Sequence, residues 1–224
     1  MRLKTYEKVL ILLVVFCFPA GCRQRTGVDI TPHPVIPEAN KLYQKALLLS
    51  ANYDVDSTEK SIDLLDRALT IDSMNPDYYG VKAKLLSELG YLDSALAIQH
   101  RADRIGAITG EYLFQLGLFQ AAKNRDAEAQ LSFSRSNEFQ KAVLKRYPDS
   151  LGAFVIQQAA NACLHGQDSL FMADMEAIRK RFPDRLMEVE MTSRLKPLHL
   201  IRQIKLMEMP VSEDPDSISE PMAD

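Results

Sequence analysis

The sequence predicts an all-α protein in which consecutive helical hairpins stack as a repeat solenoid. From Glu38 to about Met207, apolar residues recur at spacings of three and four, as at Leu85, Leu86 and Leu89, which is the period of an amphipathic helix. No segment alternates polar with β-branched or apolar residues for the length of a strand. Small residues also return at an interval of 34 residues, which indicates a repeated structural unit.

The 34-residue interval is clearest between residues 76–109 and residues 110–143. Three small residues of the first span have small counterparts in the second: Ala83 with Gly117, Ala95 with Ala129, and Ala102 with Ser136. A looser unit, residues 39–75, has Ala46, Ser61 and Ala68 at the corresponding places. Because two helices approach closely where such side chains meet, only Gly, Ala or Ser fits, and we expect these residues at helix crossings.

This pattern resembles the tetratricopeptide repeat, and the resemblance covers residues 39–143. It implies a solenoid of helix–turn–helix units with turns near Gly90 and Asn124, which are 34 residues apart. It also implies that the first helix of each unit lines a concave groove. We divide the helical body into repeats over 38–143 and a further hairpin with capping helices over 144–207.

The second part of the body has its own helix-end signals. The sequence KRYPD at 145–149 returns as KRFPD at 180–184, and each copy is expected to end a helix at an aromatic residue and a proline. We therefore predict helices over 151–165 and 168–181 with Gly166 in their turn. The segment 186–207, interrupted by Pro197, is predicted to cap the array.

The N-terminus carries a targeting signal. Basic residues at positions 2, 4 and 8 precede an uncharged run over 9–18, and small residues lead to Cys22. This is the layout of a secretory signal peptide, and the run is too short to span a bilayer. A cysteine directly after Ala20-Gly21 resembles a bacterial lipoprotein signal. The resemblance implies cleavage after residue 21 and acyl chains such as palmitate on Cys22, which would anchor the protein to a membrane.

Two polar segments flank the helical body. Residues 22–37 contain three prolines and are predicted to be an extended linker in which His33 is solvated. Residues 208–224 contain six acids, no base and three prolines, so we predict a disordered acidic tail. Removal of residues 1–21 changes the formal net charge from −3 to −5. The six acids of the tail account for this negative charge. The body is thus close to neutral, and we expect no nucleic-acid partner.

The chain lacks the motifs of known catalytic and metal sites. It has no glycine-rich phosphate loop, no Gly-x-Ser-x-Gly, no Cys-x-x-Cys and no His-x-x-x-His. Cys163 and His165 are two residues apart on a predicted helix and point to different faces, so a buried structural thiol is expected. We predict no catalytic residue, metal site or cofactor, and we expect a protein that is not an enzyme.

The family resemblance suggests where a partner would bind. Helix positions that line the groove in the family fall, in this chain, on Asn40, Tyr43, Lys84, Glu88, Glu111, Phe114 and Leu118. Asp77 and Gly80 belong to the same series of positions. The alternative is that Phe114 and Leu118 pack against a neighbouring helix, with the terminal helices folded into the groove.

Three functional hypotheses remain open from the sequence. The first is a membrane-anchored scaffold that binds a protein or peptide in the bacterial cell envelope. The second is a subunit of an outer-membrane assembly complex, and the third is an envelope enzyme with an unrecognised site. Arg23 follows Cys22, where an Asp would favour the inner membrane in enteric bacteria. By that analogy we expect a lipid-anchored protein of the outer membrane that faces the periplasm.

Overall fold

The computed structural model describes residues 29–193 and 196–208, and every regular element in these ranges is helical. The first four helices are α2 (Pro37–Ser50), α3 (Val55–Ile71), α4 (Pro76–Glu88) and α5 (Leu92–Ile105). The next four are α6 (Gly110–Ala122), α7 (Asp126–Arg146), α8 (Leu151–His165) and α9 (Asp168–Arg181). A 3-10 turn η1 (Pro183–Arg185), α10 (Leu186–Ser193) and α11 (Pro197–Met207) complete the described chain.

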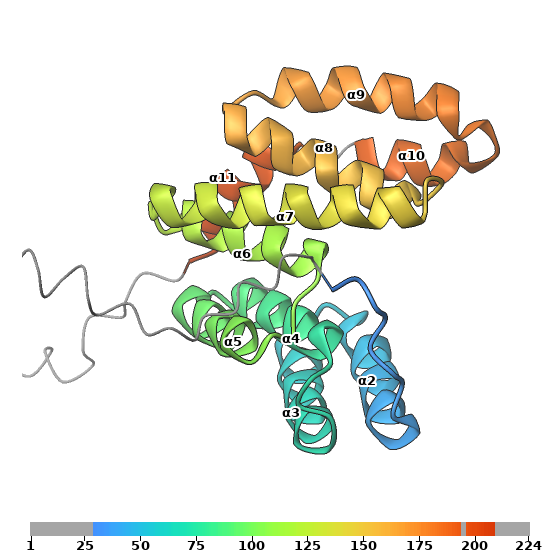
Figure 1. The fold of residues 1–224 in the computed structure, drawn as a ribbon. Helices are drawn as coiled ribbons and strands as arrows, with labels where there is room; N and C mark the ends of the chain where they lie inside the picture. Colours follow the sequence, from blue (N-terminus) through green and yellow to red (C-terminus); the bar gives the residue numbers. More distant parts are fainter. Residues whose placement is uncertain (1–28, 194–195, 209–224) are drawn as a thin grey trace, which may run out of the picture.

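Consecutive helices pack as antiparallel pairs, as the all-α hairpin prediction requires. The pairs are α2–α3, α4–α5, α6–α7 and α8–α9, and each stacks on the next (Figure 1). The predicted helices over 151–165 and 168–181 coincide with α8 and α9. Both α7 and α9 end at an arginine directly before an aromatic–proline pair, which confirms the two predicted helix ends.

The 34-residue interval also appears in the backbone of two hairpin turns. Gly90 and Asn124 both adopt left-handed conformations, with φ values of 84° and 57°. The amide that follows each of them donates to a carbonyl five residues back, from Tyr91 to Leu86 at 2.9 Å and from Arg125 to Gln120 at 2.8 Å. Asn tolerates the left-handed region better than most residues other than Gly. Two different sequences therefore form the same helix–turn–helix geometry.

Polar side chains fix where several helices begin. The side chains of Asp54, Thr109 and Ser150 accept hydrogen bonds from the amides of Ser57, Tyr112 and Ala153. Each satisfies one of the amides that a helix start leaves without a partner inside the helix. Helices α2, α4 and α11 begin with a proline, which has no amide hydrogen that needs a partner. Helix α4 also has a side-chain cap, because Asn75 accepts a hydrogen bond from the Asp77 amide.

The small residues of the repeat lie in the interior. All nine are buried: Ala46, Ser61, Ala68, Ala83, Ala95, Ala102, Gly117, Ala129 and Ser136. The Ser61 hydroxyl donates to the Ala46 carbonyl at 3.0 Å across the first hairpin. A Cβ atom on Gly117 would lie 2.5 Å from the ring of Phe133 on α7. At Gly117 the helices of the pair approach so closely that a larger side chain would displace a neighbour.

The core forms two clusters that meet at α11. The first cluster lies mainly within α2–α6, and the second joins α6 and α7 to α8, α9 and Val189 of α10. Ile201 and Ile204 of α11 pack against both clusters. Helix α11 contacts α6 most extensively and also α4, α8 and α9, so the predicted terminal capping helix lies across several units (Figure 1).

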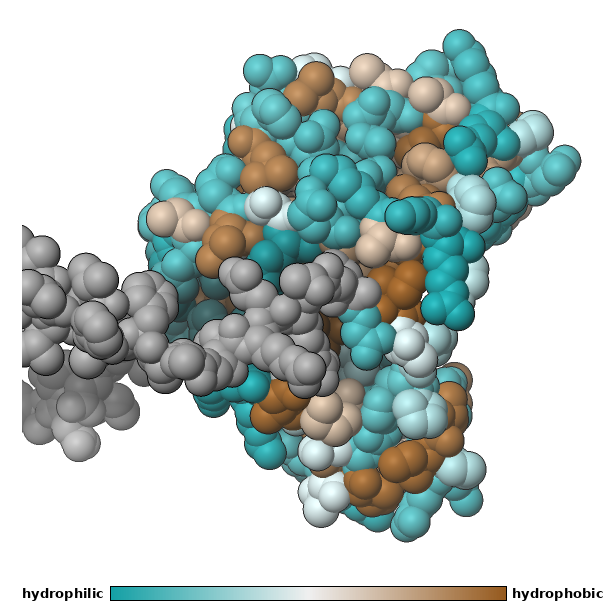
Figure 2. All heavy atoms as spheres, viewed as in Figure 1, coloured by the Kyte–Doolittle hydropathy of each residue, from teal (hydrophilic) through white to brown (hydrophobic). Residues whose placement is uncertain are grey.

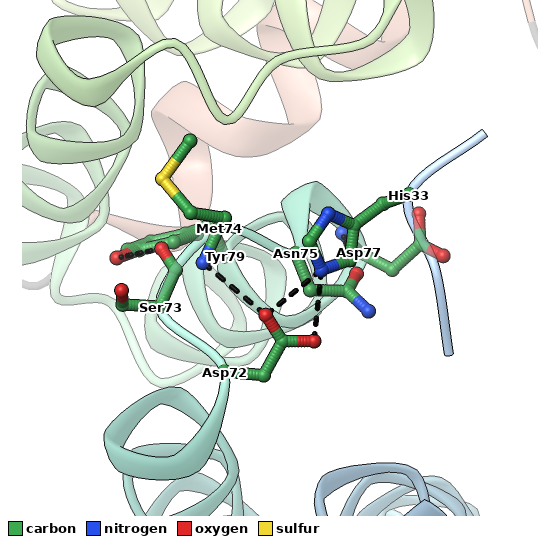
Figure 3. A network of polar contacts seen from close by, with 7 residues as sticks. All are labelled: His33, Asp72, Ser73, Met74, Asn75, Asp77 and Tyr79. Carbon is green, nitrogen blue, oxygen red and sulfur yellow. Dashed lines mark hydrogen bonds and ion pairs between the residues drawn. The ribbon is translucent and has the colours of Figure 1, made fainter. Parts of the chain in front are cut away.

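The described part of the linker is attached to the body. Figure 3 shows His33 beside Asp72, where Nε2 lies 2.8 Å and 3.0 Å from the two carboxylate oxygens. Asp72 is only 4% exposed, and Ile30 packs against the first cluster. The prediction that His33 is a solvated side chain is wrong, because a buried carboxylate at the end of α3 needs a polar partner. The part of the linker before residue 29 lies outside the described residues.

The close approach at Gly117 gives the first prediction. Gly117→Ala should lower the free energy of unfolding by about 1–3 kcal/mol, because the new methyl group overlaps the Phe133 ring. Gly152→Ala is the matched control, since no atom lies within 4 Å of its added Cβ in α8, and it should leave stability unchanged or higher. Thermal and urea unfolding of both variants measures the difference. Equal midpoints would show that Gly117 is not at a tight helix crossing.

Candidate functional site

A groove of about 260 Å³ crosses the first helices of three successive hairpins. Helix α2 contributes Tyr43, and the start of α4 contributes Pro76, Asp77, Gly80, Val81 and Lys84. The start of α6 and its N-cap contribute Thr109, Glu111, Tyr112 and Gln115. Because each hairpin presents its first helix to the same side, residues about 70 positions apart in the sequence meet at one surface. We refer to this surface as the α2–α4–α6 groove.

The α2 side of the groove is aromatic. The ring of Tyr43 lies 5.1 Å from that of Tyr78, with an angle of 40° between the planes. Burial, followed by the charge of Asp77, raises the pKa of Tyr43 above its ordinary value. Its hydroxyl therefore stays protonated and can donate a hydrogen bond at neutral pH. A tyrosine with one packed face and a polar tip is a common contact residue at protein interfaces.

Two carboxylates at the groove give it negative charge. Asp77 and Glu111 lie in the first turns of α4 and α6, where helix N-termini favour acidic side chains. Burial raises the pKa of Asp77, the charge of Glu111 raises it further, and His33 partly opposes this. Within the described residues, neither carboxylate forms an ion pair.

The nearby basic side chains form contacts with other acids. Lys84 is 2.7 Å from Glu88 in an i,i+4 ion pair, and His33 is already paired with Asp72. The Gln115 side chain is held by a hydrogen bond of 2.6 Å from the amide nitrogen of Gln99. A cationic group that enters the groove would therefore meet two acids and a fixed amide carbonyl.

Gly80 keeps the centre of the groove open. It lies on α4 opposite Gln115, and a Cβ atom added to it would approach the Gln115 side-chain oxygen at 3.7 Å. A larger side chain would fill the space between the two helices. The absence of a side chain here leaves the space between α4 and the Gln115 side chain unfilled.

The structure brings together three of the seven predicted groove residues. Tyr43, Lys84 and Glu111 all line the α2–α4–α6 groove. Asn40 is half-buried on α2, and Glu88 is exposed on α4, but neither is among the lining residues. Cys22, the predicted lipidation site, lies outside the described residues.

Phe114 and Leu118 do not face an open groove. They are 7% and 6% exposed and belong to the second core cluster, where the Phe114 ring lies 5.8 Å from that of Phe133. The expectation that they present a free binding surface is corrected by this burial. The structure agrees with the alternative, in which both residues pack against neighbouring helices. A terminal helix, α11, also contacts α6, on which they lie.

Sequence reasoning missed five of the groove residues. The family positions carried over do not include Pro76, Val81, Thr109, Tyr112 and Gln115, which all line it. Val81 and Gln115 are 34 residues apart. Asp77 and Gly80 fall on carried-over positions and also line it. The interval that relates Val81 to Gln115 was visible in the sequence, but the rotation of each helix toward the groove depends on its packing.

Metal binding, membrane spanning and thiol chemistry find little support among the described residues. Among them, no group of three His, Cys, Asp or Glu side chains could hold a metal ion, and no helix is long and apolar enough to cross a membrane. Cys163 is buried on α8, and burial raises the pKa of its thiol to about 12. A buried neutral thiol is a poor nucleophile, as expected from its sequence neighbours.

Comparison with known proteins adds no family assignment. A scan against protein-family models finds no match, and a search of curated proteins finds no significant match.

The buried position of Phe114 gives the second prediction. Phe114→Ala should lower the free energy of unfolding by about 3–5 kcal/mol, because it removes a ring packed between α6 and α7. Leu131→Ala, at an exposed position of α7, should change stability by no more than about 0.5 kcal/mol. Chemical denaturation measures both. A stable Phe114→Ala variant would mean that the side chain is free to bind a partner.

Proposed function

We propose that this protein is a non-enzymatic, tetratricopeptide-like scaffold that binds a protein or peptide segment in the bacterial cell envelope. The observation that carries the proposal is the α2–α4–α6 groove, to which three successive hairpins each contribute side chains. A surface that spans several units suits an extended segment, because repeat arrays offer continuous concave surfaces. The resemblance over residues 39–143 supports the same class of function.

The charges of the groove suggest the kind of segment. Asp77 and Glu111 have no cationic partner among the described residues, and Tyr43 adds an aromatic surface on α2. A Lys or Arg side chain could form charge-assisted hydrogen bonds with the carboxylates while its methylene groups pack on the ring. We therefore propose a ligand segment that presents a basic side chain.

The third prediction tests this groove. A displayed peptide library should enrich segments with Lys or Arg, and Asp77→Asn and Glu111→Gln should each weaken their binding about tenfold or more. Glu128→Gln is the matched control, since Glu128 is exposed on α7 and outside the groove. Fluorescence anisotropy measures the affinities. Selection of peptides without basic residues, or equal affinities for all variants, would contradict the proposal.

The same interaction should depend on pH in a defined direction. The pKa of Asp77 is above that of an ordinary aspartate, so Asp77 loses its charge at a higher pH as the solution is acidified. Attraction for a basic side chain is then present above this pKa and is lost as the pH falls through it. In Asp77→Asn this part of the pH dependence should be absent.

We further propose that a lipid on Cys22 anchors the scaffold, with the body in the periplasm at the outer membrane. The layout of residues 1–22 supports this, since a short apolar run ends in Ala20-Gly21-Cys22. Two or three acyl chains hold a protein stably on a bilayer.

The fourth prediction concerns this anchor. Cys22→Ser should abolish incorporation of a palmitate analogue and leave the protein unprocessed or released from the membrane. Cys163→Ser is the control, because Cys163 is buried in α8 and should not carry a lipid. Metabolic labelling followed by gel analysis measures incorporation. Equal labelling of Cys22→Ser and the unaltered protein would refute lipidation at this position.

A further inference from the structure

A second groove, of about 630 Å³, lies between α2 and α3, the first hairpin of the described chain. It is lined from α2 by Glu38, Lys41 and Lys45, and from α3 by Leu64, Arg67 and Ile71, among others. These residues recur at spacings of three and four, so each helix presents one continuous stripe to it. We refer to this surface as the α2–α3 groove.

The α2–α3 groove carries unbalanced positive charge. Lys41, Lys45 and Arg67 are exposed, and none of them forms an ion pair within residues 29–193 and 196–208. Glu38 is the single acid among the lining residues. Asp66, on α3, does not line the groove and pairs instead with Lys82 of α4. The lining residues therefore carry three positive charges and one negative charge, although the body as a whole is close to neutral.

Apolar side chains extend from the same hairpin. Leu48 continues the α2 stripe seven residues after Lys41 and is 76% exposed, and Val35, just before α2, is 66% exposed. Figure 2 shows apolar atoms in brown at the lower end of this hairpin, among hydrophilic side chains in teal. Cations beside exposed aliphatic side chains are typical of surfaces that rest at a membrane interface.

The attached linker places this hairpin near the proposed lipid. His33 forms a hydrogen bond with Asp72 (Figure 3). Asp72 directly follows Ile71, which lines the α2–α3 groove. Only seven peptide steps separate Cys22 from Asp29, the first described residue. Such a segment spans at most about 25 Å even when fully extended. A lipid on Cys22 would therefore keep Asp29 within about 25 Å of the bilayer surface, and the contact of His33 with Asp72 ties this segment to the end of α3.

We propose that the α2–α3 groove binds the anionic headgroups of the membrane that holds the lipid on Cys22. The proposal deepens, and rests on, the lipid attachment proposed above. Lys41, Lys45 and Arg67 contact the headgroups, and Leu48 enters the interface beside them. The anchor raises the effective concentration of headgroups at the groove, so weak individual contacts suffice to orient the body. The α2–α4–α6 groove then stays available to a protein segment.

The test uses residues 22–224 with Ser in place of Cys22, so that surface binding is measured without the lipid. Sedimentation with phosphatidylcholine vesicles should show little binding, and vesicles with about one third phosphatidylglycerol should bind in a salt-sensitive way. In the variant Lys41→Gln/Lys45→Gln/Arg67→Gln, binding should weaken roughly 100-fold, because each cation near an anionic surface contributes about fivefold. The control Lys141→Gln/Lys145→Gln/Arg146→Gln removes the same charge from the end of α7 and should bind like the parent. Thermal unfolding confirms that both variants are folded.

A second experiment measures whether the surface around Leu48, beside the α2–α3 groove, enters the membrane. An environment-sensitive dye on Leu48→Cys should shift to shorter wavelength on anionic vesicles, and the same dye on Leu131→Cys of α7 should not. Equal binding by the two triple variants, equal binding to neutral vesicles, or no shift at Leu48 would each overturn the proposal.

Binding of an acidic peptide without vesicle binding would assign the groove to a protein partner and overturn it as well. Vesicle binding seen only after deletion of residues 209–224 would instead make the acidic tail the occupant. Palmitate labelling is independent of all these outcomes, so failure of this surface and failure of the anchor are distinguishable.

Discussion

The architecture depends on close contact between the two helices of each hairpin, at positions that only small side chains can occupy. Gly117 shows this constraint most clearly, because the space of its missing Cβ is filled by the Phe133 ring. Ser61 and Ser136 use the same closeness in another way, since each hydroxyl donates to a backbone carbonyl of the facing helix, Ala46 and Gly110 respectively. These contacts set the distance between paired helices, and the stacking of the pairs follows from it. The grooves form where the stacked helices leave space between them.

One consequence is that the α2–α4–α6 groove and the core compete for the same helix faces. On α4 the first turns face the α2–α4–α6 groove, and on α6 only the first turns and Gln115 do so. Further along α6, Phe114 and Leu118 turn into the second cluster, and α11 lies across the same helix. Ile201 and Ile204 of α11 contact both clusters, so this helix joins the two halves of the core. The lining residues of the α2–α4–α6 groove therefore come from the first three described hairpins.

Charge is arranged locally rather than as a field over the whole molecule. Among the described residues, Asp77 and Glu111 of the α2–α4–α6 groove form no ion pair, and neither do Lys41, Lys45 and Arg67 of the α2–α3 groove. The contact between His33 and Asp72 lies beside both surfaces and fixes the chain that leads toward Cys22. In the proposed arrangement one groove faces the bilayer and the other faces a partner. Opposite charges on two nearby surfaces keep their ligands distinct, because each surface repels the ligand of the other.

The sequence by itself determined the class of fold, the hairpin pairs and most helix ends. Helix period, caps and proline stops act over a few residues, so the helices 151–165 and 168–181 and the buried small residues could be predicted without tertiary information. It also pointed to Tyr43, Lys84 and Glu111 through the repeat register. Only the tertiary structure decided how far each helix is rotated, which adds Val81 and Gln115 to the groove and buries Phe114. The same holds for His33 beside Asp72 and for α11 on α6, because contacts between residues 39 to about 90 positions apart depend on how the hairpins stack, which no local pattern encodes.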